Sequence, residues 1–274
     1  MGRVIMSGVV PLLSKPYVGP KASLSPTSGV TYTEGLTGLE PAEISSYAQA
    51  ISNVTGVTND TTAMYIDYGD VHRKISIGDQ VTIGVDDVSY DFNVMGFNHD
   101  SLSTSTAYGK ITKTGKAGIT FQMNICLYVL ENMEDFESNV NGWTNCTMRK
   151  LMPSYFNQLP SAWQTIVKEV NKLTSKGGQN STIVTTGDSL FLLSQIEVSG
   201  QDGYAYPGEG EQYAYYKMGN SNLKTAGGNP ANWWNRSPSK YNSTSFCIVT
   251  HGGYYNDMEA AGTSGQGVSF AFCI

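Results

Sequence analysis

Charged residues are scarce in this sequence, and basic residues nowhere gather. Only 15% of the 274 residues are charged, the formal net charge is −6, and no Lys/Arg cluster exceeds three residues. A protein that binds nucleic acid needs grouped Lys and Arg side chains to neutralise phosphates. The composition therefore argues against nucleic acid as a partner.

Long hydrophobic runs are missing as well. No apolar stretch reaches the roughly 20 residues of a membrane-spanning helix. The segment MGRVIMSGVVPLL at the start holds one Arg and a short apolar run, but it contains Pro11 and lacks an Ala-x-Ala cleavage site. We expect a soluble protein without a membrane span or an ordinary export signal.

Cysteine is rare and is not arranged for metal binding. Cys126, Cys146, Cys247 and Cys273 lie far apart, without C-x-x-C spacing or a cluster of His residues. This spacing argues against structural zinc, and we expect no metal and no cofactor. Buried free thiols are the expectation, and a Cys247–Cys273 disulfide is the alternative if their two strands are neighbours.

Small polar residues and tyrosine are abundant instead. With 40% hydrophobic residues a core is assured, while the many Gly, Ser, Thr, Asn and Tyr residues suit a β-rich protein with long loops. The length favours a main domain of about 200 residues with a smaller appendage. The surface is expected to be polar without being ionic.

Residues 1–70 differ from the rest because they are rich in Pro, Gly, Ser and Thr. They contain one expected helix that begins near Pro41 and has apolar residues at i, i+3, i+4 and i+7. We predict that residues 1–70 form an attachment or oligomerisation arm and that residues 71–274 form the ligand-binding domain. The residues of the apolar stripe are Ile44, Tyr47, Ala48 and Ile51.

Strand patterns follow this segment. Residues 75–85 and 88–97 both alternate between apolar and polar side chains, and Asp86-Asp87 between them indicates a hairpin turn. Residues 118–130 predict a third, more buried strand. Together these segments favour an antiparallel sheet.

Two helices are expected next. Asn145 or Thr144 can cap a helix over residues 147–152, which Pro153 should limit. A second helix is predicted from the S-x-x-Q capping box at Ser161 to the glycines after Lys176. Its apolar stripe is Trp163, Ile166, Val167, Val170 and Leu173. Strands, two helices and then further strands and loops define an α+β fold.

The C-terminal region has two apolar ends and a polar, aromatic middle. The ends, WWNRSP and GVSFAFCI, look like fixed scaffold, and the middle looks like a displayed contact surface. Tyr side chains offer a large contact area at low entropic cost, and Ser and Asn adapt their hydrogen bonds. The predicted ligand-binding residues are Asn235, Ser239, Lys240, Tyr241, Ser245, Ile248, Thr250, His251, Tyr254, Tyr255, Asn256, Asp257, Met258 and Glu259. The predicted structural residues are Trp233, Trp234, Arg236, Pro238, Cys247 and Cys273.

Three motifs carry a family resemblance. WWNRSP (233–238), FCIV (246–249) and GVSFAFCI (267–274) resemble, in order, a bacterial and prophage family catalogued only as a domain of unknown function and related to the C-type-lectin fold. The resemblance covers about residues 74–274. It implies a C-type-lectin-like domain in which the first and last strands pair, placing residues 81–85 near residues 268–272.

The same resemblance implies a phage-encoded display protein at a tail tip or fibre. Its location would be the virion or a bacterial prophage product made in the cytoplasm, beside other virion proteins. Homo-oligomers, commonly trimers, are typical of such proteins. The implied target is a cell-surface protein or glycan.

Some lectin-like phage proteins are varied at adenines by diversity-generating retroelements, and this C-terminal segment is similar. Many of its predicted contact residues, such as Tyr241 and Tyr254, are reachable from an Asn codon by adenine changes. Lys240, Met258, Glu259 and Gln266 are not, so diversification is a hypothesis.

Enzymatic and calcium-dependent functions find little support. His72, His99 and His251 each have an Asp nearby in sequence, but they lie in separate regions and form no Ser/His/Asp or H-E-x-x-H pattern. Formylglycine-generating enzymes share the lectin-like fold and use a closely spaced Cys pair, whereas Cys247 and Cys273 are far apart. The E-P-N, Q-P-D and W-N-D motifs of calcium-dependent lectins are absent.

The sequence therefore predicts a non-enzymatic receptor-binding or display protein. Two alternatives stay open. In the first, the C-terminal loops only pack against neighbouring subunits of a virion. The second is an enzyme of the formylglycine-generating type.

Overall fold

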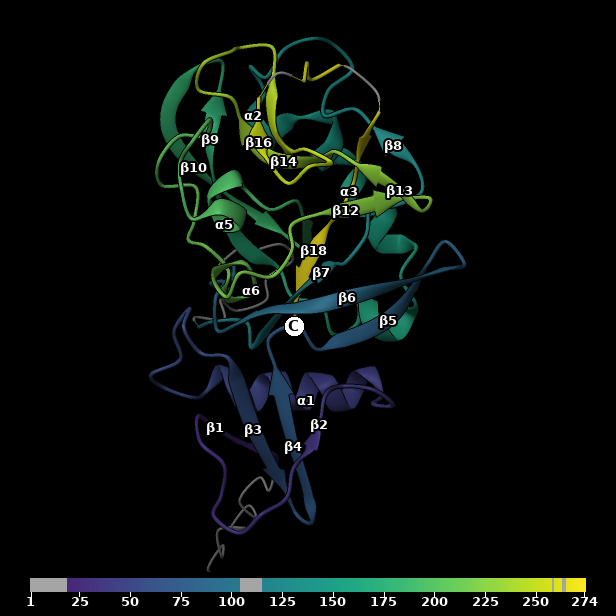
Figure 1. Ribbon diagram of the computed structural model, residues 1–274, viewed down its shortest axis with the longest axis vertical. Coiled ribbons are helices and arrows are strands. Elements are labelled where there is room, and N and C mark those ends of the chain that lie inside the picture. The colour runs from purple at the N-terminus through teal and green to yellow at the C-terminus, as the bar shows by residue number, and fades with distance from the viewer. Residues whose placement is uncertain (1–18, 104–114, 258, 263–264) are drawn as a thin grey trace, which may run out of the picture.

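The computed structural model describes residues 19–103, 115–257, 259–262 and 265–274. The fold is mixed α+β, mostly sheet with a few short helices, as predicted (Figure 1). Among the described residues, no helix is both long enough and apolar enough to cross a membrane.

A small N-terminal sheet has the order β1-β3-β4-β2 and packs with one long helix, α1 (Pro41–Ser52). Its strands are β1 (Lys21–Ser23), β2 (Thr33–Glu34), β3 (Ala63–Tyr68) and β4 (Val71–Ser76). Because β3 and β4 form an antiparallel hairpin, the predicted boundary at residue 70 falls inside that hairpin, and the N-terminal sheet extends to Ser76.

Helix α1 confirms the predicted stripe. Pro41 opens the helix, Glu43 lies in its first turn, and Ile44, Tyr47, Ala48 and Ile51 are all buried. In Figure 1 the helix lies between the N-terminal sheet and the β5–β6 hairpin, so the two parts share one core. The contact is close at Gly118, where a Cβ atom would lie 1.9 Å from the carbonyl oxygen of Ala48.

The central sheet is antiparallel and has the order β11-β18-β7-β6-β5. Its strands are β5 (Gln80–Val85), β6 (Val88–Phe97), β7 (Ile119–Met123), β11 (Leu190–Phe191) and β18 (Ala271–Cys273). The predicted pairing of residues 81–85 with 268–272 is wrong, because β6 and β7 lie between β5 and β18. The last strand inserts between β7 and β11 instead.

Local turn chemistry in this sheet matches the sequence. Asp86 and Asp87 have φ angles of 49° and 62°, the left-handed conformation that a two-residue type I′ hairpin requires. The hairpin prediction is therefore confirmed. The predicted strand over residues 118–130 is confirmed only for β7, since the chain leaves the sheet after Met123.

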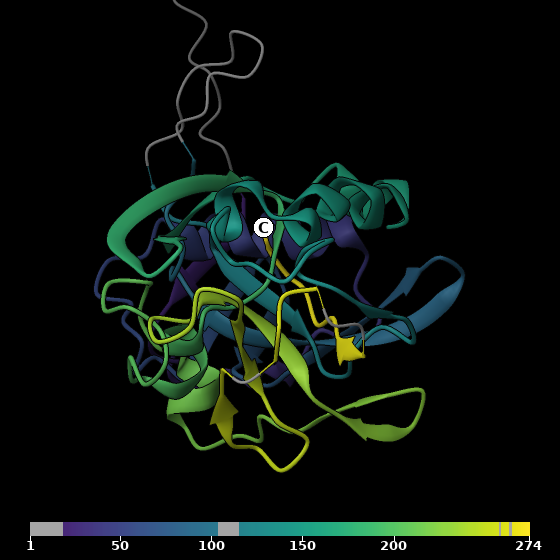
Figure 2. The ribbon, with the colours of Figure 1, turned by 90° about the horizontal axis from the view of Figure 1, so that it is seen from above.

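A second five-stranded sheet has the order β16-β15-β14-β17-β8. Its strands are β8 (Leu130–Glu131), β14 (Trp233–Pro238), β15 (Phe246–Val249), β16 (Tyr255–Asn256) and β17 (Gln266–Gly267). Two further hairpins are β9 (Val170–Gly177) with β10 (Asn180–Asp188), and β12 (Lys224–Ala226) with β13 (Asn229–Ala231). Figure 2 shows β9–β10 curving along one side and β5–β6 and β12–β13 projecting on the other.

The remaining helices are short. They are α2 (Gly142–Asn145), α3 (Thr147–Asn157), α4 (Ser161–Gln164), α5 (Gln195–Ser199) and α6 (Ala214–Lys217). Helix α3 continues through Pro153, so the prediction that this proline limits the helix is wrong. Its cap is also different, because the Cys146 thiol, not Asn145 or Thr144, accepts from the backbone N–H of Arg149.

The predicted helix from Ser161 to Lys176 is wrong beyond α4. Residues from Val170 onward form β9, which places Val170, Lys172 and Thr174 on its buried face. Because the inward-facing Lys172 and Thr174 are polar, the sequence lacks the apolar–polar alternation expected of a strand. Leu173 on the outer face instead gives the segment apolar residues at helical spacing. Gly177 and Gly178, with φ angles of 82° and 61°, turn the β9–β10 hairpin and do not end a helix.

Candidate functional site

Strand β14 contains the tryptophans that were predicted to be structural. Trp233 and Trp234 are fully buried. Their indole N–H groups donate to the carbonyl oxygens of Asn222 at 3.0 Å and Glu131 at 2.7 Å. Because a buried indole N–H needs an acceptor, both side chains are locked in place. Pro238, which is also buried, pairs with Phe246 at the end of the hairpin.

Arg236 is the most heavily bonded residue of the strand. Its side chain is fully buried, and both Nη atoms bond the Glu197 carboxylate, with Nη2 to Oε1 at 2.9 Å. Nη1 also donates to Leu192 O at 2.9 Å, and Nη2 to Leu173 O at 3.0 Å. Glu197 is held in turn by a capping box with Ser194 at the start of α5. The hairpin is thereby tied to α5 and to β9.

A second buried cation extends this network. Lys172 Nζ lies 2.7 Å from Glu197 Oε1, 2.7 Å from Asp100 Oδ1 and 3.1 Å from the Tyr213 hydroxyl. Its three ammonium protons therefore have three oxygen partners. Successive ion pairs link Asp100 to Lys172, Lys172 to Glu197 and Glu197 to Arg236. Two negative and two positive charges make this network neutral as a whole.

The neighbours keep both acids ionised despite their burial. Burial alone would raise the pKa of Glu197, but Arg236 and Lys172 hold it below its ordinary value. For Asp100, burial again acts to raise the pKa, and Lys172 outweighs it and lowers the pKa. Replacing a whole buried ion pair by apolar residues is often neutral, whereas removing one partner is strongly destabilising.

His99, Asp100 and Glu197 bring possible metal-ligand atoms within 4.8 Å of one another. The Lys172 ammonium, however, bonds both carboxylates and lies between them. A cation bound there would meet that positive charge at close range. This cluster is a salt-bridge network and a poor metal site.

The histidines have separate local partners. His72 Nδ1 lies 2.6 Å from Asp67, His99 Nδ1 lies 2.9 Å from Asn59 Oδ1, and His251 Nδ1 lies 3.1 Å from Asn232 Oδ1. None of these partners is the aspartate adjacent in sequence that suggested an acid–base pair. The three imidazoles do not form a common site.

The four cysteines are buried free thiols, as expected, and the alternative Cys247–Cys273 disulfide is not formed. Burial raises the pKa of both Cys247 and Cys273 well above the ordinary thiol value. Cys273 Sγ lies 3.3 Å from Asp100 Oδ2, next to the salt-bridge network. Such thiols are poor sources of the thiolate that redox or metal chemistry needs.

The loop of residues 239–245 joins β14 to β15 and is held by one buried side chain. Asn139 Nδ2 donates to Asn242 O at 2.8 Å and to Ser245 O at 2.6 Å. Within the loop, Ser239 Oγ accepts from the backbone N–H groups of Tyr241 and Asn242, both at 3.0 Å. These bonds fix the loop backbone while the Tyr241 side chain stays 64% exposed.

The loop that follows α5 contacts the loop of residues 239–245 and contains two more tyrosines, Tyr204 and Tyr206. The rings of Tyr204 and Tyr241 meet edge to face at 6.2 Å, and Lys240 N donates to Tyr204 O at 2.9 Å. Gln179 Nε2 donates to Tyr241 O at 3.1 Å, and the backbone carbonyl oxygen of Gln179 accepts from the Tyr206 hydroxyl at 2.7 Å. We call Tyr204, Tyr206 and Tyr241 the tyrosine surface.

The loop of residues 250–254 lies at the other end of β15. Gly253 N donates to Thr250 O, and Asn222 Nδ2 donates to Gly253 O at 2.9 Å. Tyr254 on this loop is 77% exposed. Because a strand rises about 3.3 Å per residue, the two loops are separated by roughly 15 Å. Strand β16 pairs antiparallel with β15, and Ser239 Oγ donates to Asp257 Oδ2 at 2.5 Å, so residues 255–257 lead from the second loop back to the first.

Part of the predicted contact set lies inside the protein. Buried side chains present no surface to a ligand, so the structure removes Asn235, Ser239, Ser245 and Ile248 from the contact surface. Met258 lies outside the described residues. The candidates that remain exposed or half-buried are Lys240, Tyr241, Thr250, His251, Tyr254, Tyr255, Asn256, Asp257 and Glu259.

Sequence reasoning missed Tyr204, Tyr206 and Gln179. The signal was the segment QDGYAYPGEG, where two tyrosines stand between glycines and a proline in a loop. It also missed the S-x-x-E capping box at Ser194, which would have placed Glu197 at a helix start. Neither signal says which distant loop the segment will meet.

The geometry is that of an α+β domain with a rigid loop base and an exposed aromatic surface. A family model described as Domain of unknown function (DUF6273) matches residues 123–274, more than half of the chain, and the chain belongs to this family. No curated protein and no solved structure matches the sequence. The match begins at Met123, the last residue of β7, and leaves residues 1–122 outside it.

Proposed function

We propose that this is a non-enzymatic recognition protein of a phage or prophage, whose C-type-lectin-like domain binds a cell-surface protein or glycan through the tyrosine surface. One observation carries the proposal. A largely exposed Tyr241 side chain stands on a loop whose backbone is fixed by Asn139.

Fixing the loop in advance favours binding. A flexible loop loses conformational entropy when a ligand orders it, at a cost of roughly 0.5–1.5 kcal/mol for each immobilised side chain. The backbone of residues 239–245 is already ordered by Asn139 and Ser239. Tyr side chains then add a large contact area with few rotatable bonds.

The chemistry of the surface is neutral. Lys240 Nζ lies 3.3 Å from Asp202 Oδ2 and 5.1 Å from the centre of the Tyr241 ring, so its charge is matched locally. The remaining groups are tyrosine hydroxyls and the Asn242 amide. Binding would rest on aromatic contact and neutral hydrogen bonds, and would depend weakly on salt.

The test replaces Tyr204 and Tyr241 together by Ala. The variant and the wild type, fluorescently labelled, are applied to a panel of bacterial cells and to a glycan array. The proposal expects strong loss of binding in the variant with unchanged thermal unfolding. Tyr68→Ala is the control, because Tyr68 is 46% exposed on the distant β3 strand.

Undiminished binding by the double variant would contradict the proposal. Failed particle assembly with no cellular or glycan ligand would favour the structural virion subunit. Tyr254→Ala asks separately whether the other end of β15 takes part.

Diversification by a retroelement is a further part of the proposal. It expects a nearby reverse transcriptase gene and an imperfect repeat of the 3′ coding segment that differs at adenines. Exposed positions such as Tyr241, His251 and Tyr254 would vary most, because substitutions there leave the core intact.

A further inference from the structure

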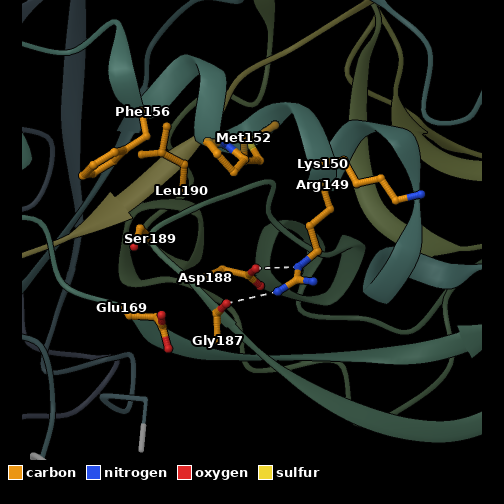
Figure 3. Close-up of a pocket in the computed structure, with 10 residues that line it drawn as sticks. Arg149, Lys150, Met152, Phe156, Glu169, Gly187, Asp188, Ser189 and Leu190 are labelled. Atoms are coloured by element: carbon orange, nitrogen blue, oxygen red, sulfur yellow. Dashed lines mark hydrogen bonds and ion pairs between the residues drawn. The ribbon is translucent and has the colours of Figure 1, made fainter. Parts of the chain in front are cut away.

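A cavity of about 380 Å³ lies away from the tyrosine surface, between helix α3 and the end of β10 (Figure 3). One wall is apolar, and the opposite wall is polar and contains charged side chains. Ligand sites typically measure about 300–1,000 Å³ and combine an apolar lining with a few placed polar groups. The apolar wall consists of Met152, Pro153, Phe156 and Leu190.

The Arg149–Asp188 ion pair contributes no free charge to the cavity. Arg149 Nε lies 2.6 Å from Asp188 Oδ1, and its two Nη atoms donate to the carbonyl oxygens of Thr144 and Gly187. The Asp188 carboxylate also accepts from Trp143 Nε1 at 3.0 Å. Both groups are therefore satisfied by the protein and neutralise each other.

Two charged lining residues, Glu169 and Lys150, form no ion pair within the part of the chain that the structure describes, and Glu169 is half-buried. Lys150 also borders the cavity, but Figure 3 shows its side chain directed away from Glu169 and from the apolar wall. The unmatched charge of the cavity is thus negative.

Gly187 makes room for this carboxylate. A Cβ atom at position 187 would lie 2.4 Å from Glu169 Oε1, closer than such atoms approach. Its φ angle is not in the left-handed region, so alanine suits the backbone, and its Cβ would displace the Glu169 carboxylate together with Ser103 Oγ, which lies 2.7 Å from the same point. The backbone of Glu169 is held in turn, since its carbonyl accepts from Ser103 N at 2.9 Å.

We propose that this cavity binds a small organic cation with an apolar body, such as an arylalkyl or alkyl amine. The ammonium group pairs with the Glu169 carboxylate, and the apolar body packs against Met152, Phe156 and Leu190. An anionic ligand would face an unmatched carboxylate and is disfavoured. This site is independent of the recognition function proposed above.

Three probes of the same shape test the charge preference: 3-phenylpropylamine, 3-phenylpropan-1-ol and 3-phenylpropionate. Each is titrated into the full chain in an isothermal calorimeter. The amine is expected to bind at least about tenfold more tightly than the other two, because a hydrogen bond to a charged group contributes on the order of 1.5–3 kcal/mol.

Two variants act on the carboxylate by different routes. Glu169→Gln removes the charge and Gly187→Ala displaces it, and each should reduce amine affinity about tenfold or more while binding of the alcohol changes little. Lys150→Ala is the matched control and should leave amine affinity unchanged. Thermal unfolding of each variant reports whether the fold is intact.

The proposal is overturned if the propionate binds as tightly as the amine, or if the amine does not bind at all. It is also overturned if Glu169→Gln, with unfolding unchanged, keeps the amine preference. Binding of all three probes with equal affinity would mean that only the apolar wall acts.

Discussion

Arg236 and Glu197 form a two-pronged ion pair inside the protein, with Nη1 facing Oε2 and Nη2 facing Oε1. Their side chains are 0% and 3% exposed. The pair joins the middle of β14 to the first turn of α5. It therefore sets the position of the hairpin whose far end carries the tyrosine surface.

Replacing Arg236 by Met should destabilise the protein strongly. The change leaves Glu197 buried with only Lys172 as counter-ion. It also removes the hydrogen-bond donor of the carbonyl oxygens of Leu192 and Leu173. Breaking one side of a buried pair costs about 3–5 kcal/mol. Urea unfolding followed by tryptophan fluorescence measures the loss. Lys74→Met, which breaks an exposed pair with Glu34, should leave the midpoint unchanged. A similar midpoint for all three proteins would show that the buried pair is dispensable.

Local signals in the sequence predicted local structure well. The stripe of α1 and the Asp86-Asp87 turn depend on residues near one another in the chain, and both are confirmed. Strand β9 was missed because its inward positions Lys172 and Thr174 are polar, and only distant partners such as Asp100 make their burial favourable. A pattern of apolar and polar residues cannot predict the burial of a charged side chain whose partner is distant in the sequence.

The same distinction holds for the candidate site. Exposure of Tyr241 followed from its place in a polar, glycine-punctuated segment. The contribution of Tyr204 did not, because it comes from a loop that meets residue 240 only in the folded chain. Tyr241 and Tyr254 are 13 residues apart in the sequence, and that short separation did not show that they lie at opposite ends of β15.

Replacing Asn235 by Leu should stabilise the protein. Its side chain is fully buried, and within the described residues neither its Oδ1 nor its Nδ2 has a hydrogen-bond partner. An unsatisfied buried polar group costs about 1–3 kcal/mol, so Asn235→Leu should raise the free energy of unfolding by about that amount. Urea unfolding is the measurement.

Asn139→Leu is the matched control for this change. Asn139 is equally buried, but its amide bonds Asn242 O and Ser245 O. Its replacement should destabilise the protein. If Asn235→Leu also destabilises, the amide at position 235 has a partner, such as a bound water molecule, and the prediction is wrong.

The thiols should be inert in the folded protein. All four are buried and free, and burial raises the pKa of Cys126 and of Cys146 to about 12. Since the thiolate is the reactive form, Ellman's reagent should label none of them in native buffer and all of them in denaturant. Rapid labelling of the native protein would mean that a cysteine is more accessible than the fold allows.

Lys224 should make stability rise at alkaline pH. Burial lowers the pKa of Lys224 to about 8, since its ammonium has only the Met123 carbonyl at 2.5 Å and the face of Trp233 nearby. The unfolded chain keeps the ordinary value of 10.5. Between these two values the unfolded state binds more protons, so the free energy of unfolding increases with pH, by roughly 3 kcal/mol in all.

Lys224→Met should remove this rise, because methionine carries no proton and fills similar space. Below about pH 8, where the wild type buries a charged ammonium, the variant should also be the more stable protein. Urea unfolding of both proteins at intervals from pH 7 to pH 10.5 gives the two slopes, and the difference between them isolates Lys224 from other titrating groups. Lys217→Met, at an exposed position, should keep the wild-type slope. Equal slopes for the wild type and Lys224→Met would contradict the prediction, because they would mean that burial does not lower the pKa of Lys224.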